Sequence, residues 1–237
     1  MNIYFLVEGE KTEPKVYPQW LSHLIPQLAR VKFSCDAREN NYYLMSGMGS
    51  PRILTDELAN SVEDINQLGN YNYLVLVIDA DDMTAQDKIA EVQSFIVDNN
   101  IILNSSCHLC IIAQKYCMET WFLGNKKVYT KILNKKIDFY NHSLFYDVSL
   151  QDPELMQKPK WFNDDSISIY HETYLRKMLA EKNIRYSKSN PREVGEKYYL
   201  EELNKRINET PHLSSLKNFF SFCKSISIQQ AVTHDAQ

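Results

Sequence analysis

Two aspartates follow the longest unbroken apolar run of the chain. Residues 74–78 are all Leu, Val or Ile, and the run stops at Asp79-Ala80-Asp81. Residues two apart in an extended backbone point to the same side, so we expect Asp79 and Asp81 side by side. Adjacent carboxylates repel unless a cation or a proton lies between them, and oxygen-only ligands suit Mg²⁺ or Mn²⁺ better than zinc. The alternative is an acidic loop in which Asp82 or Thr84 caps the next helix.

Two further carboxylates also follow predicted strands. Glu8 comes directly after the first apolar run of the chain, and Glu119 comes soon after the run at 108–114. The carboxyl ends of parallel strands meet at one edge of a sheet, so these acids are expected to converge with the two aspartates. Such a cluster could hold one or two divalent ions that clamp the attacking and leaving oxygens of a phosphodiester. The alternative for Glu119 is a salt bridge to Lys115 or Lys126.

Elements with helix and strand patterns alternate along the first half of the chain. A strand buried on both faces of a parallel sheet has a continuous apolar run, as at 3–7 and 74–78. The pattern predicts an α/β fold with a mainly parallel sheet flanked by helices. The expected strands are 2–7, 74–78 and 108–114, together with 31–35 and 42–45 as two short strands or one interrupted strand. The expected helices are 13–29, 51–68 and 84–99. A short helix is expected around Glu119.

The second half is expected to be mainly helical. Helical spacing of apolar residues predicts helices over 166–182, 192–208 and 213–223, with a frayed tail from 229 to the end. We therefore expect a catalytic core over 1–125 and a helical extension over 126–237 that packs on it or belongs to the same domain.

Lysines alternate with aromatic residues over 125–160. This pattern is typical of proteins that bind single-stranded nucleic acid, but a solvated helix face over the edge of a core explains it as well and is preferred. The residues are Lys126, Lys127, Tyr129, Lys131, Lys135, Lys136, Phe139, Tyr140, Phe145 and Tyr146.

Composition places the chain among ordinary globular proteins. Its 237 residues are 44% hydrophobic and 24% charged, with a net charge of −4, which excludes bulk electrostatic capture of nucleic acid but not a local basic patch. No apolar stretch is long enough for a membrane span, and the N-terminus lacks a signal pattern. Five cysteines with no secretory signal fit a reducing cytoplasm. Cys107 and Cys110 have the spacing of half a zinc site, with no second half.

The acidic motifs resemble those of the Toprim (topoisomerase–primase) fold. Val7-Glu8-Gly9 matches its strand ending in Glu-Gly, and Asp79-Ala80-Asp81 matches its later Asp-x-Asp. The longer stretch from Val7 to Glu13 is similar to the nuclease branch that includes the overcoming-lysogenization-defect (OLD) and RloB-like proteins, as is 117–123. Tyr186-Ser187-Lys188 is similar to a Tyr-x-Lys of small Toprim-like proteins. One departure is that Asp82-Met83 follows where topoisomerase members have glycine.

The resemblance implies a role for each matching residue. Glu8 would be a metal ligand or the general base, Asp79 and Asp81 would hold Mg²⁺ (or Mn²⁺), and Glu119 would be a further ligand or an orienting group. Lys188 would neutralise the scissile phosphate.

Glu13 would share the metal shell through a water molecule, although an acid in the first turn of a helix is equally ordinary. The resemblance also implies a Rossmann-like Toprim core and a metal-dependent nuclease that cleaves DNA or RNA, including tRNA. It also implies a role in bacterial anti-phage defence. Family members often act beside an ABC-type ATPase, and this chain has no Walker motif of its own, so a separate ATPase partner subunit is implied. A homodimer is the default expectation. Two rival hypotheses are a non-catalytic Toprim module that binds a partner or nucleic acid, and an α/β protein that binds a Mg-nucleotide.

Overall fold

A five-stranded parallel sheet forms the centre of the molecule. The computed structural model describes residues 1–129, 137–164 and 166–234. The strand order is β2-β3-β1-β4-β5, and every neighbouring pair is parallel. The strands are β1 (Asn2–Val7), β2 (Ala29–Arg30), β3 (Asn41–Ser46), β4 (Tyr73–Asp79) and β5 (His108–Gln114). The predicted α/β fold with a parallel, helix-flanked sheet of the Rossmann-like kind is therefore confirmed.

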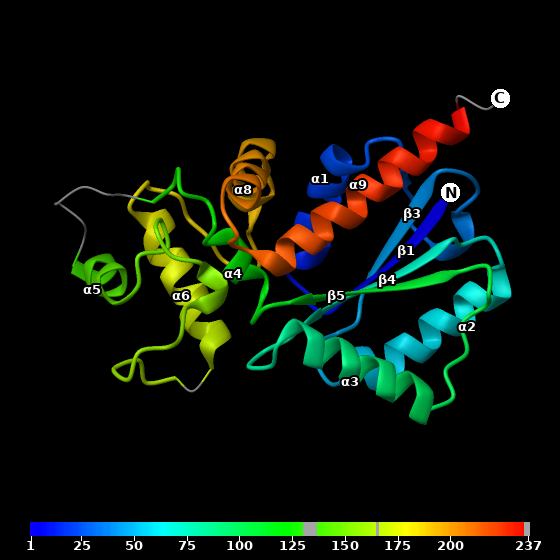
Figure 1. The fold of residues 1–237 in the computed structure, drawn as a ribbon, viewed down its shortest axis with the longest axis horizontal. Coiled ribbons are helices and arrows are strands. Elements are labelled where there is room, and N and C mark those ends of the chain that lie inside the picture. Colours follow the sequence, from blue (N-terminus) through cyan, green and yellow to red (C-terminus); the bar gives the residue numbers. More distant parts are fainter. Residues whose placement is uncertain (130–136, 165, 235–237) are drawn as a thin grey trace.

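Helices cover both faces of the sheet. On one face lie α1 (Glu13–Leu24) and α9 (Ser214–His234), and on the other lie α2 (Leu58–Leu68) and α3 (Ala85–Asp98) (Figure 1). Because side chains alternate along a strand, Ile3 and Phe5 of β1 pack with the first pair of helices and Tyr4 packs with the second. Both faces of the sheet are therefore covered by helices and shielded from water. This is why the central strands have unbroken apolar sequences.

The remaining helices gather at the carboxyl ends of the strands (Figure 1). They are α4 (Met118–Phe122), α5 (Ile137–Phe145), α6 (Ile167–Ala180), α7 (Arg192–Gly195) and α8 (Lys197–Glu209). Side chains of α4, α6, α8 and α9 belong to the same hydrophobic cluster as β1 and α1. The two halves of the chain therefore share one core.

The buried Arg206 of α8 ties this part of the chain together. Its guanidinium donates hydrogen bonds to the carbonyl oxygens of Gly124 (3.0 Å), Val148 (2.7 Å) and Gln151 (2.6 Å). A buried cation is costly unless it is hydrogen-bonded, and here backbone dipoles supply the partners.

Several predicted boundaries are wrong. The first helix ends at Leu24 instead of residue 29, since Pro26 disfavours helical backbone at Ile25. Residues 31–35 are not a strand; β2 is two residues long and a 3₁₀ turn follows at Ser34–Asp36. The helix predicted over 192–208 is split into α7 and α8 by extended backbone at Glu196.

The last helix is longer than expected. It begins at Ser214 and continues to His234, through most of the tail that was predicted to fray, and residues 235–237 lie outside the described residues. Within the described part of the chain, no helix combines the length and apolar character that a membrane span requires.

Candidate functional site

Glu8 lies at the point where β1 and β4 end side by side. Val7 is in register with Val77, and the backbone N–H of Glu8 continues the ladder with a bond to the Val77 carbonyl (3.0 Å). The Glu8 carboxylate then reaches over the neighbouring strand, where its Oε2 accepts a hydrogen bond from the backbone N–H of Asp79 (3.0 Å). The predicted convergence of the first and fourth strand ends is thus found.

Glu13 folds back onto the turn that precedes α1. It is buried, and its Oε2 accepts a hydrogen bond of 2.6 Å from the backbone N–H of Gly9. A Cβ at Gly9 would lie only 3.3 Å from this oxygen, so glycine permits the close approach. Burial first, and then the charges of Glu8 and Glu119, raise the pKa of Glu13 to about 8, although the Gly9 hydrogen bond acts in the opposite direction.

Asp79 is the last residue of β4 and is the least satisfied acid of the group. Its Oδ1 is buried and has no hydrogen-bond partner among the described residues. Burial is the largest cause that raises the pKa of Asp79 well above its usual range, followed by the charges of Glu13, Glu8 and Glu119. A carboxylate in this position is stabilised by a bound proton or a bound cation.

Glu119, in the first turn of α4, approaches from the other side. It is 2% exposed, and its Oε1 accepts a hydrogen bond from the Tyr186 hydroxyl (2.8 Å). The Tyr186 hydroxyl is therefore a partner of Glu119, and the Lys115 ammonium donates instead to the Met83 carbonyl (2.6 Å).

Lys188 enters the site on a loop from the second half of the chain. The Thr12 hydroxyl donates to the Lys188 carbonyl (3.4 Å), and the Lys15 ammonium donates to the Ser189 carbonyl (2.5 Å), which fixes the loop to the start of α1. The Lys188 Nζ lies 3.6 Å from the Glu172 carboxylate of α6. Burial alone would lower the pKa of Lys188, but the charges of nearby groups, Glu119 first among them, reverse this and raise it.

Glu13, Asp79, Glu119 and Lys188 line one pocket of about 260 Å³ at the carboxyl edge of the sheet, and Glu8 lies beside it, at the backbone of Asp79. The acids of the pocket are Glu10, Glu13, Asp79 and Glu119, and its lysines are Lys11 and Lys188. The other lining residues are Gly9, Thr12, Gly49 and Met118.

Asp81 is not placed as the sequence predicts. The strand ends at Asp79, and Asp81 has a left-handed backbone (φ 47°) with an antiparallel bridge to Tyr116. The extended geometry that would set Asp79 and Asp81 side by side is therefore absent, and Asp81 is exposed and does not line the pocket. The capping alternative is correct in part, because the Thr84 hydroxyl accepts a hydrogen bond from the backbone N–H of Asp87 at the start of α3 (3.1 Å).

Sequence reasoning missed two polar residues of this edge. Gln114 ends β5 in register with Asp79, is fully buried and donates a hydrogen bond to the Tyr17 hydroxyl. Lys88 of α3 is 7% exposed. The signal for Lys88 was its spacing, since it precedes the buried Val92 by four residues and so lies on the apolar stripe of the helix.

The donor set fits a hard divalent cation, although no ligand cage is assembled in advance. Among the described residues, no three His, Cys, Asp or Glu side chains are grouped closely enough to hold a metal ion. Glu8 and Glu13 each give one oxygen to a backbone amide, and Asp79 Oδ1 has no partner. Carboxylate oxygens suit Mg²⁺ or Mn²⁺, and the partnerless oxygen of Asp79 is where such an ion would bind first.

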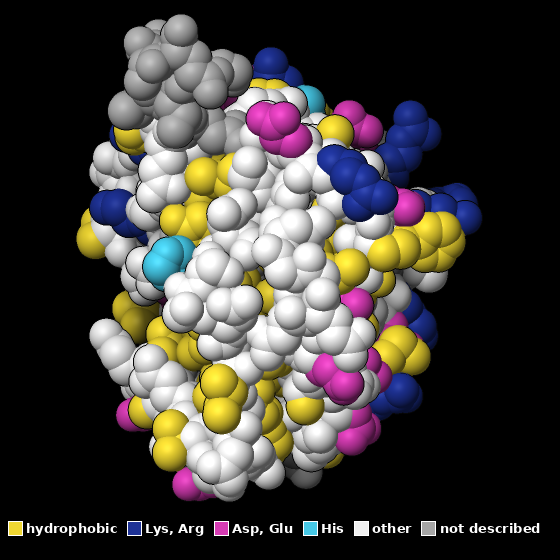
Figure 2. Space-filling model, turned by 90° about the vertical axis from the view of Figure 1, so that its right-hand side faces the viewer, with side chains coloured by type: hydrophobic (Ala, Val, Ile, Leu, Met, Phe, Trp, Pro, Cys, Tyr) yellow, Lys and Arg dark blue, Asp and Glu magenta, His cyan; other side chains and the backbone are white. Residues whose placement is uncertain are grey.

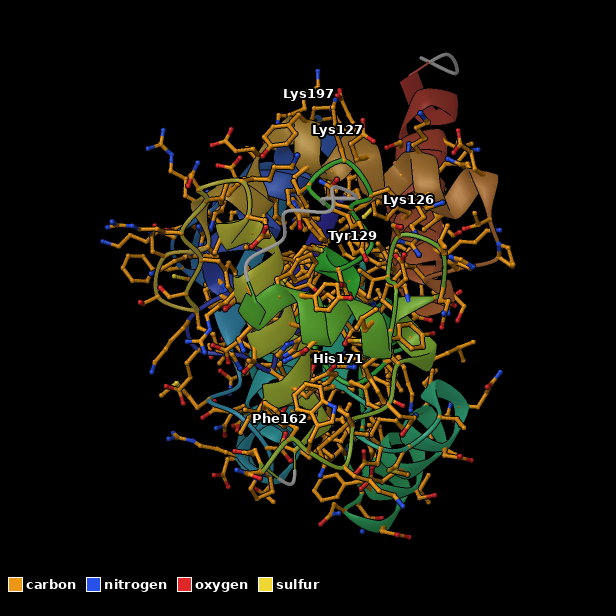
Figure 3. All side chains as sticks on the ribbon, turned by 90° about the vertical axis from the view of Figure 1, so that its left-hand side faces the viewer. Lys126, Lys127, Tyr129, Phe162, His171 and Lys197 are labelled. Atoms are coloured by element: carbon orange, nitrogen blue, oxygen red, sulfur yellow. The ribbon has the colours of Figure 1, made fainter. Side chains whose placement is uncertain are left out.

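The lysine-rich segment is not an uncompensated basic track where the structure describes it. Tyr129 and Phe139 are core residues, as expected for a helix face over a core edge. Lys127 and Lys197 lie at one end of the face in Figure 3, where they pair with Glu202 (3.3 Å) and Glu201 (3.8 Å). Lys131, Lys135 and Lys136 lie outside the described residues.

The opposite end of the molecule offers no charged patch either. Figure 2 shows the face at the amino ends of the strands, where acidic and basic side chains are interspersed and neither kind gathers in one place.

Comparisons with protein-family models, with curated proteins and with solved structures give no match for this chain. The geometry of the pocket is therefore the basis for inferring its function.

Proposed function

We propose that this chain is a divalent-metal-dependent nuclease whose active site is the pocket at the carboxyl edge of the sheet. The observation that carries the proposal is the buried Oδ1 of Asp79, which has no partner among the described residues and lies among acids that disfavour its charge. Asp79 would hold Mg²⁺ or Mn²⁺, with Glu13 and Glu119 completing the ligand set from the pocket walls.

Different residues of the site would then contribute to different parts of phosphodiester hydrolysis. A divalent ion, when bound, lowers the pKa of a water molecule and stabilises charge on the phosphate oxygens. Burial raises the pKa of Glu8, which makes its carboxylate a stronger base, and Glu8 would act as the general base from beside Asp79, whose backbone N–H it binds. Lys188 supplies a positive charge on the opposite wall, where it can neutralise the scissile phosphate.

A bound phosphate would replace the Glu172 carboxylate as the ion-pair partner of the Lys188 ammonium. That ion pair spans 3.6 Å and is partly exposed, so exchanging one anion for another costs little. The pocket opens at the surface beside Lys11, a second cation for the nucleic-acid backbone.

Further parts of the proposal come from the resemblance to OLD and RloB-like Toprim proteins. They are a DNA or RNA substrate (tRNA included), an ABC-type ATPase partner subunit, a homodimer, a cytoplasmic location and a role in bacterial defence. They are supported by the order of the motifs along the chain, each at a strand end.

A rival proposal is a non-catalytic binding module. It is favoured by one observation, namely that the Glu8 and Glu13 carboxylates are already satisfied by backbone amides. In such a module these acids would serve only to close the turns at the strand ends.

Cleavage assays separate the two. Purified protein is incubated with labelled plasmid DNA and with total tRNA, in Mg²⁺, Mn²⁺ or EDTA, beside Asp79→Asn and Glu8→Gln variants. We expect metal-dependent cleavage of one substrate class that both substitutions abolish. Nucleic-acid binding that survives both substitutions, with no cleavage in any metal, would instead support the binding module.

A further inference from the structure

Two neighbouring residues at the carboxyl edge each have a buried oxygen with no hydrogen-bond partner among the described residues. One oxygen is Oδ1 of Asp79, the last residue of β4, and the other is Oε1 of Gln114, the last residue of β5. Asp79 and Gln114 are Cα partners in the parallel ladder, and the Gln114 carbonyl accepts a hydrogen bond from the backbone N–H of Ala80 (2.8 Å). Neighbouring strands lie about 4.8 Å apart and residues in register point to the same face, so the two side chains are adjacent.

Both side chains point toward α1. Val77 and Ile112 precede them by two residues on the same strands and belong to the core on the α1 side of the sheet, and alternate residues of a strand share a face. The Gln114 amide reaches α1 directly, because its Nε2 donates a hydrogen bond to the Tyr17 hydroxyl. Glu13, which lines the pocket, precedes Tyr17 by four residues and so lies on the same side of this helix.

The hydrogen bond to Tyr17 sets the orientation of the Gln114 amide. It engages Nε2 and leaves Oε1, which has no hydrogen-bond partner in the part of the chain that the structure describes. Gln114 is 0% exposed, and a fully buried polar atom is costly unless it is bonded. Oδ1 of Asp79 has the same deficit on the neighbouring strand. A single cation between the two strand ends would bind both oxygens and remove both costs.

We propose that Gln114 is a further ligand of the divalent ion, which its Oε1 binds beside Oδ1 of Asp79. Carboxylate and carbonyl oxygens both suit Mg²⁺ and Mn²⁺, and a neutral amide adds a ligand without adding to the negative charge of the surrounding acids. Among the described residues, no group of three His, Cys, Asp or Glu side chains could hold an ion, and Gln114 supplies a ligand of a different kind. This assignment depends on the proposed metal site at Asp79 and adds a ligand from the neighbouring strand.

The test is isothermal titration calorimetry of Mn²⁺ into the full chain. Gln114→Met removes both polar atoms of the amide at similar size, and Gln114→Glu keeps an oxygen at this position. Tyr17→Phe removes the hydrogen bond to Nε2 but leaves Oε1 in place. Gln93→Met, at an exposed glutamine of α3, is the matched control. A thermal melt of each variant in EDTA checks that it is folded.

Gln114→Met should bind Mn²⁺ at least about 10-fold more weakly than the wild type, since even residues that only orient metal ligands change the affinity 10- to 100-fold. Gln114→Glu, Tyr17→Phe and Gln93→Met should bind it nearly as tightly as the wild type. Unchanged affinity in a folded Gln114→Met, or an equal loss in Gln114→Met and Tyr17→Phe, would overturn the assignment of Gln114 and leave the Asp79 site in place.

Crystals of the wild type soaked in Mn²⁺ supply a measurement that needs no variant. The anomalous peak should lie about 2.1 Å from the amide oxygen of Gln114 as well as from Oδ1 of Asp79. A peak bound to Asp79 but out of reach of Gln114 would overturn the role of Gln114 alone. If the wild type bound no Mn²⁺ at all, the proposed metal site would be wrong, and the assignment of Gln114 with it.

Discussion

The backbone N–H of Asp79 and the Oε2 of Glu8 lie 3.0 Å apart, so the carboxylate that ends β1 is hydrogen-bonded to the residue that ends β4. The bond uses one Glu8 oxygen and fixes the side chain over the neighbouring strand. The carboxylate of Asp79 takes no part in this bond, and its Oδ1 has no hydrogen-bond partner among the described residues. The site is thus ordered in its backbone and unsatisfied at the atom that would carry the cation.

Replacing Asp79 should stabilise the metal-free protein while removing its function. Asp79→Asn removes a carboxyl whose charged form is disfavoured by burial and by the neighbouring acids, so the free energy of unfolding at neutral pH in EDTA should rise by about 1 kcal/mol or more. Urea denaturation in EDTA measures this. Asp82→Asn, at the exposed neighbour, is the control and should leave the midpoint unchanged. A large loss of stability in Asp79→Asn would show that the carboxylate has a structural partner.

Stability without metal should fall as the pH rises. Burial raises the pKa of Glu13 to about 8, so between its unfolded value near 4.5 and about pH 8 the folded state binds more protons than the unfolded state. The stabilisation is complete below the unfolded pKa and is lost as the pH passes through the folded pKa.

The Tm of Glu13→Gln minus the Tm of the wild type, both measured in EDTA, should therefore increase from pH 5 to pH 8. Each kcal/mol corresponds to roughly 2–4 °C for a chain of this size. Added Mn²⁺ should cancel the trend in the wild type, because a cation replaces the proton. A difference in Tm that does not vary with pH would contradict the assignment of Glu13.

Tyr186 should matter for folding as well as for the site. Its hydroxyl is the partner of the buried Glu119 carboxylate at 2.8 Å, and hydrogen bonds to charged groups contribute about 1.5–3 kcal/mol. Tyr186→Phe should lower the free energy of unfolding by about this amount in urea, whereas Tyr140→Phe, at a half-exposed tyrosine, should not. Equal stability of both variants would mean that Glu119 has another partner.

Lys188 should affect cleavage without being needed for the metal. Lys188→Met removes a positive charge from the pocket wall, so Mn²⁺ binding should be retained, while the rate constant for cleavage should fall about 10²- to 10³-fold. Lys182→Met, at an exposed lysine before the same loop, is the matched control. Loss of Mn²⁺ binding in a folded Lys188→Met would assign the lysine a structural role instead.

The sheet was predictable because its signal is local and strong. Runs such as 74–78 have no polar residue, and only a strand covered on both faces needs that. The position of Glu8 followed from the same rule, since parallel strands bring their carboxyl ends together.

What the sequence did not predict depends on tertiary contacts or on backbone conformation that residue types leave open. Asp81 has a positive φ that the Asp-x-Asp spacing does not reveal. Tyr186 reaches Glu119 across 67 residues, and no periodic pattern encodes such a contact. Lys88 was recognisable as a charge on the apolar stripe of α3, but its burial depends on how this helix packs against the sheet.

The most direct test of the metal site is diffraction from crystals soaked in Mn²⁺, with data collected to give the anomalous signal of manganese. Our account predicts a peak in the pocket, about 2.1 Å from Oδ1 of Asp79, that disappears in EDTA and in Asp79→Asn. A Mn²⁺-soaked crystal with no peak at Asp79, or with its peak at another group of residues, would contradict the account.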